Sequence, residues 1–408
     1  MIKQLRYTKW SLLVFIFQMN ISCSSAQPKT DGNEQKVEET IEETIVLGNR
    51  RLNEYLPFLK NKRVAIVGNH TSFIGETHLV DSLLALNTTI VKVFSPEHGF
   101  RGVADAGEKV NNEIDPKTGL EIISLYGNNK KPSTQQLSDV DILLFDIRDV
   151  GVRFYTYIST LHYVMEAAAE QGKRVIVLDR PNPNGHYVDG PILKRSQKSF
   201  IGLHPVPIVH GMTIGEYANM INGELWLKNG VTADLTVIAC ENYSHNRLYE
   251  LERAPSPNLP NMKSVYLYPS LCFFEGTPIS VGRGTNKPFQ QIGHPSMNSF
   301  SYNFTPKSNV GAKNPKLKGE SCFGIDLSSL TEEELKKWDQ LNLSFLIRFY
   351  QQYPQKDKFF TNFFNLLAGN KALQTAIKAE KTELEIRNSW KEGLERYHIV
   401  RNKYLLYD

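Results

Sequence analysis

The sequence predicts an α/β fold in which a parallel β-sheet is covered by helices on both faces, followed by a second, smaller α/β domain. Short apolar runs recur through the first half of the chain at intervals that leave room for a helix between them. These runs are apolar at nearly every position, which is typical of parallel strands buried on both faces. A chain of 408 residues is also long enough for two cores.

The expected elements of the sheet begin near residue 45. A helix with apolar residues at helical spacing is predicted near residues 52–59, ahead of the first strand. A second helix is predicted over residues 158–171, between the third and fourth strands. The five expected strands cover residues 63–68, 90–94, 141–147, 173–178 and 205–209.

The pattern changes in the second half of the chain. Residues 253–321 are irregular and rich in proline and glycine. Thr331 and Glu334 predict a capping box at the start of a helix, and residues 370–390 continue in helical fashion. We therefore expect a boundary at about residues 225–233, which separates a domain over residues 45–229 from a smaller domain over residues 230–408 that closes the cleft.

The N-terminus has the features of an export signal. Lys3, Arg6 and Lys9 precede an apolar segment over residues 10–19, which is too short for a permanent transmembrane helix. The segment ends at Cys23, in a context that predicts a lipidated first residue of the mature chain; plain secretion is the alternative. We expect a lipoprotein signal peptide over residues 1–23, a flexible linker over residues 24–44, and a location on a bacterial membrane facing the periplasm.

Composition limits the function classes. With 41% hydrophobic and 22% charged residues, the chain falls in the ordinary range for globular proteins. A formal net charge of +4 gives no indication of nucleic-acid binding. The cysteines beyond Cys23 are Cys240, Cys272 and Cys322, which lack metal-ligand spacing and allow at most one disulfide.

A polar cluster follows each expected strand. The carboxyl ends of parallel strands lie along one edge of a sheet, where such folds bind their ligands. We therefore expect one crevice lined by residues 68–72, 95–98, 146–149, 179–184 and 210–213.

Three common chemistries fit this edge poorly. The first strand lacks the glycines of a dinucleotide site, no P-loop occurs, and no Gly-x-Ser-x-Gly motif is present, so we expect no nucleotide, no other cofactor and no serine nucleophile. A metal-dependent hydrolase stays an alternative, although its candidate ligands lack the local pairing of a metal site: His70, His98, Asp146, Asp149 and His210.

Glu97 is the first candidate catalytic residue. Glycosidic cleavage requires a carboxylic acid that protonates the leaving oxygen and a second group that stabilises or attacks the anomeric carbon. Pro96, Phe100 and the preceding strand predict apolar surroundings, which would raise the pKa of Glu97 into the range of a general acid. The alternative is a loop carboxylate paired with Arg101.

Asp146 and Asp149 are candidates for the second catalytic carboxylate. An aspartate at the end of a buried strand is costly unless it is paired or functional. The alternative is that one of them caps the helix that starts near Thr156 or pairs with Arg153.

The remaining candidates are substrate-binding residues. Loop arginines are suited to bidentate carboxylate recognition, and tyrosines offer faces for a sugar. We expect the loops at residues 274–277 and 280–285 to fold over the crevice. The set is Asn69, His70, His98, Arg101, Arg153, Tyr155, Tyr157, Arg180, His210, Glu275 and Arg283.

Several of these segments together resemble the exo-β-N-acetylmuramidases of glycoside hydrolase family 171. The resemblance covers the chain from about residue 45 to its end. The segments that carry it are residues 67–72, 94–102, 124–127, 145–157, 178–185, 209–216, 256–260, 274–277 and 280–285. Arg148 departs from the glutamine found in many members.

The resemblance implies a Rossmann-like domain with a smaller α/β domain and an active site between them. It implies release of N-acetylmuramic acid from the non-reducing end of peptidoglycan fragments, such as muropeptides with a MurNAc-GlcNAc unit, during cell-wall turnover or recycling. Glu97 matches the glutamate regarded as catalytic in that family. The acetamido group of the sugar leaves a substrate-assisted route open. A surface lipoprotein that binds muropeptides without cleaving them is the alternative function.

Overall fold

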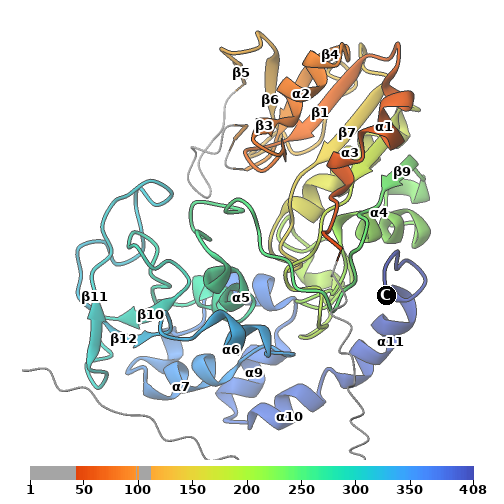
Figure 1. The fold of residues 1–408 in the computed structure, drawn as a ribbon. Coiled ribbons are helices and arrows are strands. Elements are labelled where there is room, and N and C mark those ends of the chain that lie inside the picture. Colours follow the sequence, from red (N-terminus) through yellow and green to blue (C-terminus); the bar gives the residue numbers. More distant parts are fainter. Residues whose placement is uncertain (1–42, 98, 101–111) are drawn as a thin grey trace, which may run out of the picture. The chain divides into compact units, whose positions relative to one another are not determined.

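A large, mostly parallel sheet organises the N-terminal half of the computed structural model, which describes residues 43–97, 99–100 and 112–408 (Figure 1). Its strand order is β5-β6-β4-β1-β7-β8-β9, and every neighbouring pair except β5 and β6 is parallel. This confirms the expected α/β class. The strands are β1 (Val64–Gly68), β4 (Ile90–Ser95), β5 (Glu113–Ile114), β6 (Glu121–Ser124), β7 (Ile142–Asp146), β8 (Arg174–Leu178) and β9 (Asp234–Ile238).

Helices cover both faces of this sheet because alternate strand residues point to opposite sides. Val64 and Ile66 pack in one apolar core with α1 (Leu52–Leu59) and α2 (Leu79–Ala85). Ala65 and Val67 face the other core, which contains α3 (Tyr157–Glu170) and α4 (Ile214–Gly223). Both helices predicted beside the sheet, at residues 52–59 and 158–171, are confirmed to within one residue.

The prediction of a fifth strand at residues 205–209 is wrong. Pro205 and Pro207 have no N–H to donate to a ladder, and Val209 forms isolated bridges with Val152 and Asp189 instead. The sheet is extended by β6 and β9, which the apolar pattern did not predict. β9 lies after the boundary expected near residues 225–233, yet it pairs with β8 along its length.

The C-terminal half contains a small antiparallel sheet and a series of short helices. The sheet has the order β10-β12-β11. The core beneath α3 and α4 continues into this half through residues such as Val265, Phe349 and Leu373. The elements are α5 (Met262–Leu271), β10 (Gln291–His294), β11 (Tyr302–Phe304), β12 (Cys322–Asp326), α6 (Glu332–Lys336), α7 (Ser344–Gln352), α8 (Asn362–Ala368), α9 (Ala372–Lys378), α10 (Glu383–Asn388) and α11 (Lys391–Arg401).

Shorter elements complete the fold. A two-stranded hairpin, β2 with β3, follows β1, and single turns of 3₁₀ helix connect longer elements. The predicted capping box is confirmed, since Thr331 and Glu334 bond reciprocally at the start of α6. These elements are β2 (Phe73–Ile74), β3 (Thr77–His78), η1 (Gly48–Arg50), η2 (Arg195–Gln197), η3 (Lys228–Gly230), η4 (Cys272–Gly276) and η5 (Lys356–Lys358).

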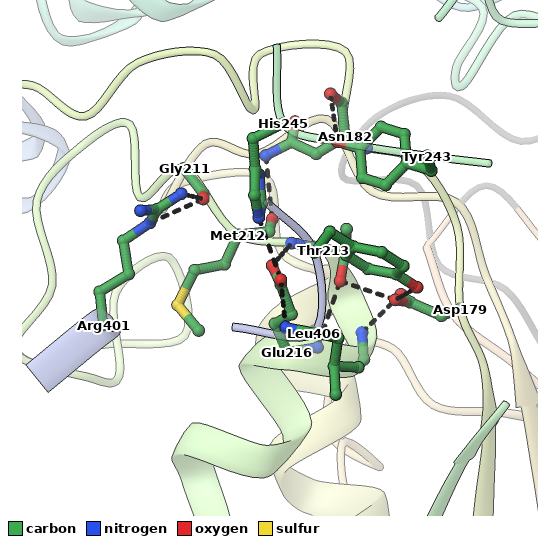
Figure 2. Close-up of polar contacts among 12 residues, drawn as sticks. Asp179, Asn182, Gly211, Met212, Thr213, Glu216, Tyr243, His245, Arg401 and Leu406 are labelled. Carbon is green, nitrogen blue, oxygen red and sulfur yellow. Dashed lines mark hydrogen bonds and ion pairs between the residues drawn. The ribbon is translucent and has the colours of Figure 1, made fainter. Parts of the chain in front are cut away.

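The C-terminal segment after α11 returns to the edge of the large sheet (Figure 2). The backbone N–H of Leu406 donates to Glu216 Oε1 over 2.8 Å, and the Tyr407 hydroxyl donates to Asp179 Oδ2 over 2.6 Å. His245 also contacts Glu216 Oε1, at 3.0 Å from Nε2. Glu216 belongs to α4 and Asp179 follows β8, so this segment ties the end of the chain to the sheet.

Two sequence expectations concern anchoring and cysteines. The signal peptide, Cys23 and almost all of the expected linker lie outside the described residues. Over the described ranges, no helix has the length and apolar character needed to cross a membrane. Cys240, Cys272 and Cys322 are buried free thiols.

Candidate active site

Glu97 lies in a tight turn at the carboxyl end of β4. The turn is closed by the Gly99 N–H, which donates to the Pro96 carbonyl over 3.1 Å, and Gly99 adopts a φ of 75°. Phe100 follows, is buried, and packs edge-on against His78 with ring centroids 4.7 Å apart. The buried strand before Glu97 and the anchored phenylalanine after it hold the glutamate in a defined place.

Tyr126 is brought to Glu97 by the register of two neighbouring strands. Ser95 at the end of β4 is paired with Ser124 at the end of β6, and each functional side chain lies two residues further on. The Tyr126 hydroxyl hydrogen-bonds to the Glu97 carboxylate. Burial and then the charge of Glu97 raise the pKa of Tyr126, so its hydroxyl stays protonated and donates.

The start of α3 supplies the second contact to Glu97. Thr156 Oγ1 donates to Glu97 Oε2 over 3.3 Å. Tyr157 lies beneath, with its hydroxyl 3.5 Å from the Glu97 carbonyl oxygen, and accepts a hydrogen bond from Asn69 Nδ2 over 3.0 Å. Asn69 therefore acts on the site through Tyr157.

Glu97 opens into a cavity of about 390 Å³. The cavity combines aromatic and aliphatic walls with a few hydroxyl, amide and charged groups, which is the usual make-up of a small-molecule site. Its described lining is Glu97, Tyr126, Phe154, Tyr155, Thr156, Tyr157, Phe200, Ile201, Ser256, Asn258, Leu259, Tyr268, Cys272, Glu275, Arg283, Phe289, Phe363 and Leu367.

Glu275 and Arg283 form an ion pair in the lining. Arg283 Nε donates to Glu275 Oε1 over 3.1 Å, and the guanidinium lies over the Phe289 ring at 4.9 Å. Gly282 and Gly284 on either side of the arginine both adopt a φ of 77°. A side chain at Gly284 would collide with the Lys307 carbonyl. The backbone around Arg283 thus has a conformation that glycine alone adopts easily.

Asp146 and its partners lie outside the described lining. Asp146 is fully buried and forms an ion pair with Arg180, whose Nε is 2.8 Å from Oδ1. Asn49 Nδ2 donates to the other carboxylate oxygen over 3.2 Å. His70 is also absent from the lining and contacts the Ala254 carbonyl at 3.1 Å. These contacts favour structural roles, although a catalytic role for Asp146 stays an untested prediction.

Asp149, His210 and Arg153 are buried residues that also lie outside the described lining. Asp149 Oδ2 accepts from the Gly151 N–H over 2.7 Å and lies 3.8 Å from His210 Nε2. Arg153 is fully buried, and its terminal nitrogens donate to backbone carbonyls, including that of Leu367 at 3.0 Å.

The cavity therefore gathers Glu97, Tyr155, Tyr157, Glu275 and Arg283 from the predicted set. Tyr155 and Tyr157 meet edge to face at 4.9 Å, and the Tyr155 hydroxyl donates to the Pro255 carbonyl. His98 and Arg101 lie outside the described residues. Within the part of the chain that the structure describes, no three His, Cys, Asp or Glu side chains are grouped as metal ligands.

Several lining residues escaped the sequence analysis as candidates. Tyr126 follows a four-residue strand that was too short to predict, although the same strand-end rule applies to it. Thr156 was considered only as the start of a helix. Ser256 and Asn258 reach the cavity from the irregular region after residue 253, and periodicity gives no information there.

Comparison with known proteins gives consistent matches over most of the chain. Residues 64–263 match the family model described as exo-beta-N-acetylmuramidase NamZ, N-terminal, and residues 266–407 match its C-terminal counterpart. The chain is 38% identical over 406 residues to the peptidoglycan beta-N-acetylmuramidase NamZ of Bacillus subtilis (strain 168), covering 95% of this chain and 96% of that protein.

Two solved structures from Bacteroides fragilis NCTC 9343 have the same fold, and both are described as DUF1343 family proteins. One, at 1.30 Å resolution, is 50% identical, with a TM-score of 0.84 over 90% of this chain and 99% of that one. The other, at 1.65 Å, is 28% identical, with a TM-score of 0.76 over 89% of this chain and 99% of that one.

Proposed function

The chain belongs to the NamZ family of exo-β-N-acetylmuramidases, and from this premise we propose that its cavity releases N-acetylmuramic acid from the non-reducing end of peptidoglycan fragments. It is a glycoside hydrolase, and a role in cell-wall turnover is consistent with the relative of known activity. The observation that carries the assignment is Glu97, a carboxyl group that two hydroxyls orient into a sugar-sized cavity.

Glu97 is the general acid that protonates the glycosidic oxygen. Removal of this group is expected to cost two to four orders of magnitude in rate. The deciding assay measures release from a chromogenic β-N-acetylmuraminide by the wild type and by Glu97→Gln. No release by the wild type, or equal release by both proteins, would contradict the proposal.

The partner of Glu97 is the acetamido group of the substrate. Among the described lining residues, Glu275 is the other carboxylate, and Arg283 neutralises it. The carbonyl oxygen of the acetamido group attacks the anomeric carbon while Glu97 protonates the leaving oxygen. Substrates with a mono-, di- or trifluoroacetyl group test this step, because fluorine weakens the nucleophile. A steep fall in kcat supports it, whereas an unchanged kcat would return the role to a protein carboxylate.

Arg283 is the recognition residue for the lactyl carboxylate of N-acetylmuramic acid. Its bond to Glu275 and its contact with Phe289 fix the plane of the guanidinium, which is the geometry that bidentate carboxylate binding requires. We expect Arg283→Met to raise KM for the muraminide about tenfold or more. The matched measurement uses a β-N-acetylglucosaminide, which lacks the lactyl group; an equal loss with both sugars would refute this role.

The N-terminal segment is proposed to export the protein and to anchor it through a lipid on Cys23, facing the periplasm. The sequence features that support this are the basic residues before the apolar segment and the cysteine at its end. Cys23→Ser should move the protein from the membrane fraction to the soluble fraction. Mass spectrometry of the N-terminal peptide would identify the lipid, and an unmodified Cys23 would rule the anchor out.

A further inference from the structure

Lys316 ends among backbone carbonyls of the loop that carries Glu275. An ammonium group has three N–H donors, so it can satisfy three of these acceptors and lies at the limit of hydrogen-bond range for the fourth. The distances from Nζ are 2.6 Å to the Thr277 oxygen, 3.1 Å to Phe274, 3.2 Å to Ile279 and 3.5 Å to Glu275. The lysine nitrogen thus occupies the place that a small cation takes in a carbonyl-lined site.

The Thr277 and Ile279 carbonyls depend most on the ammonium group, because the Phe274 carbonyl also accepts from the Thr277 N–H over 3.0 Å and from the Thr277 hydroxyl over 2.9 Å. After η4 the chain leaves helical geometry at Thr277, so successive carbonyl oxygens converge on one side. Phe274, Thr277 and Ile279 are buried. A buried carbonyl left without a partner costs about 1–3 kcal/mol, so the loop would rearrange if the ammonium group were removed.

The segment that carries Lys316 is itself packed against the Arg283 loop. The Lys307 N–H donates to the Gly284 carbonyl over 2.8 Å, and a side chain at Gly284 would also collide with Pro315. Leu317, the next residue after Lys316, has a φ of 59°, a conformation that costs a leucine about 1 kcal/mol or more. The fold therefore holds Lys316 in place against local backbone preference.

The charges of the Glu275–Arg283 ion pair also act on Lys316. Burial lowers the pKa of Lys316, while the charge of Glu275 raises it and the charge of Arg283 lowers it. Lys316 does not belong to the described cavity lining, whereas Glu275 and Arg283 do. Any effect of Lys316 on the substrate must therefore pass through the loop that it binds.

We propose that Lys316 is a positioning residue for the muramidase reaction: its ammonium group ties the carbonyls of residues 274–279 together and thereby fixes the Glu275 carboxylate against Arg283. This inference rests on the proposed function and adds a residue to it. Lys316 acts before the substrate arrives, by keeping the arginine oriented for the lactyl carboxylate.

A double-mutant cycle tests this role. We expect Lys316→Met to raise KM for the chromogenic muraminide about tenfold with a much smaller change in kcat, as expected for lost substrate positioning. Because Lys316 acts through Glu275, the double variant Lys316→Met with Glu275→Gln should resemble the worse single variant. Lys318→Met, at an exposed lysine in the same segment, is the matched control and should retain wild-type constants. Additive losses in the double variant, or wild-type KM in Lys316→Met, would overturn the proposal.

Chemical rescue supplies the second measurement. In Lys316→Ala, ethylammonium added to the assay should bring the raised KM most of the way back to the wild-type value, and it should leave the KM of the wild type unchanged. A KM of Lys316→Ala that ethylammonium does not lower would count against the role. If Lys316→Met does not fold, Lys316→Gln replaces it in the cycle. Its amide supplies at most two N–H donors, carries no charge and ends one bond short of the ammonium position, so KM should still rise, and a wild-type KM there would also overturn the proposal. An inactive wild type would refute the proposed function, whereas an active wild type with an equally active Lys316 variant refutes this inference alone.

Discussion

Asp179 and Glu97 are two carboxylates that follow strands of the same sheet, and their surroundings differ. Asp179 accepts four hydrogen bonds, from the N–H groups of Arg180 and Gly215 and from the hydroxyls of Thr213 and Tyr407. Glu97 instead receives the hydroxyls of Tyr126 and Thr156 and lines a cavity. Backbone donors and Tyr407 of the C-terminal segment surround Asp179, which makes it structural, whereas Glu97 lines a cavity that a substrate can enter.

Glu216 joins Asp179 in a structural group, as Figure 2 shows. Its carboxylate accepts from the Thr213 N–H over 2.9 Å and from the Leu406 N–H over 2.8 Å, and it contacts His245. Both kinds of acidic residue come from polar clusters after apolar runs or from the helix that follows. The difference teaches that the partners of a carboxylate, rather than its position after a strand, distinguish a structural carboxylate from a candidate catalytic one.

The largest expected effect is on catalysis at Glu97. Glu97→Gln should lower kcat roughly thousandfold, because the amide cannot protonate the leaving oxygen. Asp179→Asn is the matched control from the structural group and should keep kcat within about twofold per folded molecule. Steady-state kinetics with circular dichroism would check both; a comparable loss of kcat in the control would remove the contrast.

Glu216→Ala should have the opposite effect to Glu97→Gln, with a large loss of stability rather than a large loss of kcat. It leaves two backbone N–H groups and His245 without their acceptor, so the free energy of unfolding should fall by about 3–4 kcal/mol. Glu224→Ala removes the contacts of another carboxylate with Tyr404 and Lys403, which are partly exposed to solvent, and should cost no more than about 1 kcal/mol. Urea unfolding measures the free energy of unfolding of both variants. Equal losses would show that the burial of Glu216 does not make its carboxylate more important for stability than that of Glu224.

Asp179 should give the structural group a distinctive pH dependence. Burial raises the pKa of Asp179 to about 6 from an ordinary value of 3.8, against the opposing effect of its hydrogen bonds. Its contribution to stability is therefore complete below about pH 4 and is lost as the pH rises through about 6. The unfolding free energy of the wild type relative to Asp179→Asn should fall by about 2 kcal/mol between pH 4 and pH 7. A pH-independent difference would contradict the raised pKa.

The smallest expected effect concerns the hydroxyl that orients Glu97. Tyr126→Phe removes one hydrogen bond to a carboxylate and should lower kcat about tenfold with little change in KM. Tyr404→Phe makes the same chemical change at the bond to Glu224, outside the described cavity lining. It should leave kcat unchanged. If Tyr126→Phe were also silent, the other contacts of Glu97 would suffice to hold its carboxylate.

The sequence was most informative where local pattern and burial coincide. Apolar runs predicted four of the strands because parallel strands buried on both faces have a near-continuous apolar composition. The run at residues 205–209 misled because its prolines interrupt hydrogen bonding, and β9 was missed because most of its residues are only partly buried. Glu97 was found from its position after a buried strand and from the resemblance to a family.

By itself, then, the sequence determined the α/β class and predicted a site at the strand ends with Glu97 as its principal glutamate, since these depend on neighbours along the chain. Tertiary structure alone decided which polar residues face the cavity. The sequence made Arg180 a candidate for substrate contact, but in the fold it is paired with Asp146. Tyr126 reaches Glu97 only through the register of β4 and β6. The reason is physical: a polar side chain at the end of a buried strand requires a partner, and residues far away in the sequence supply that partner.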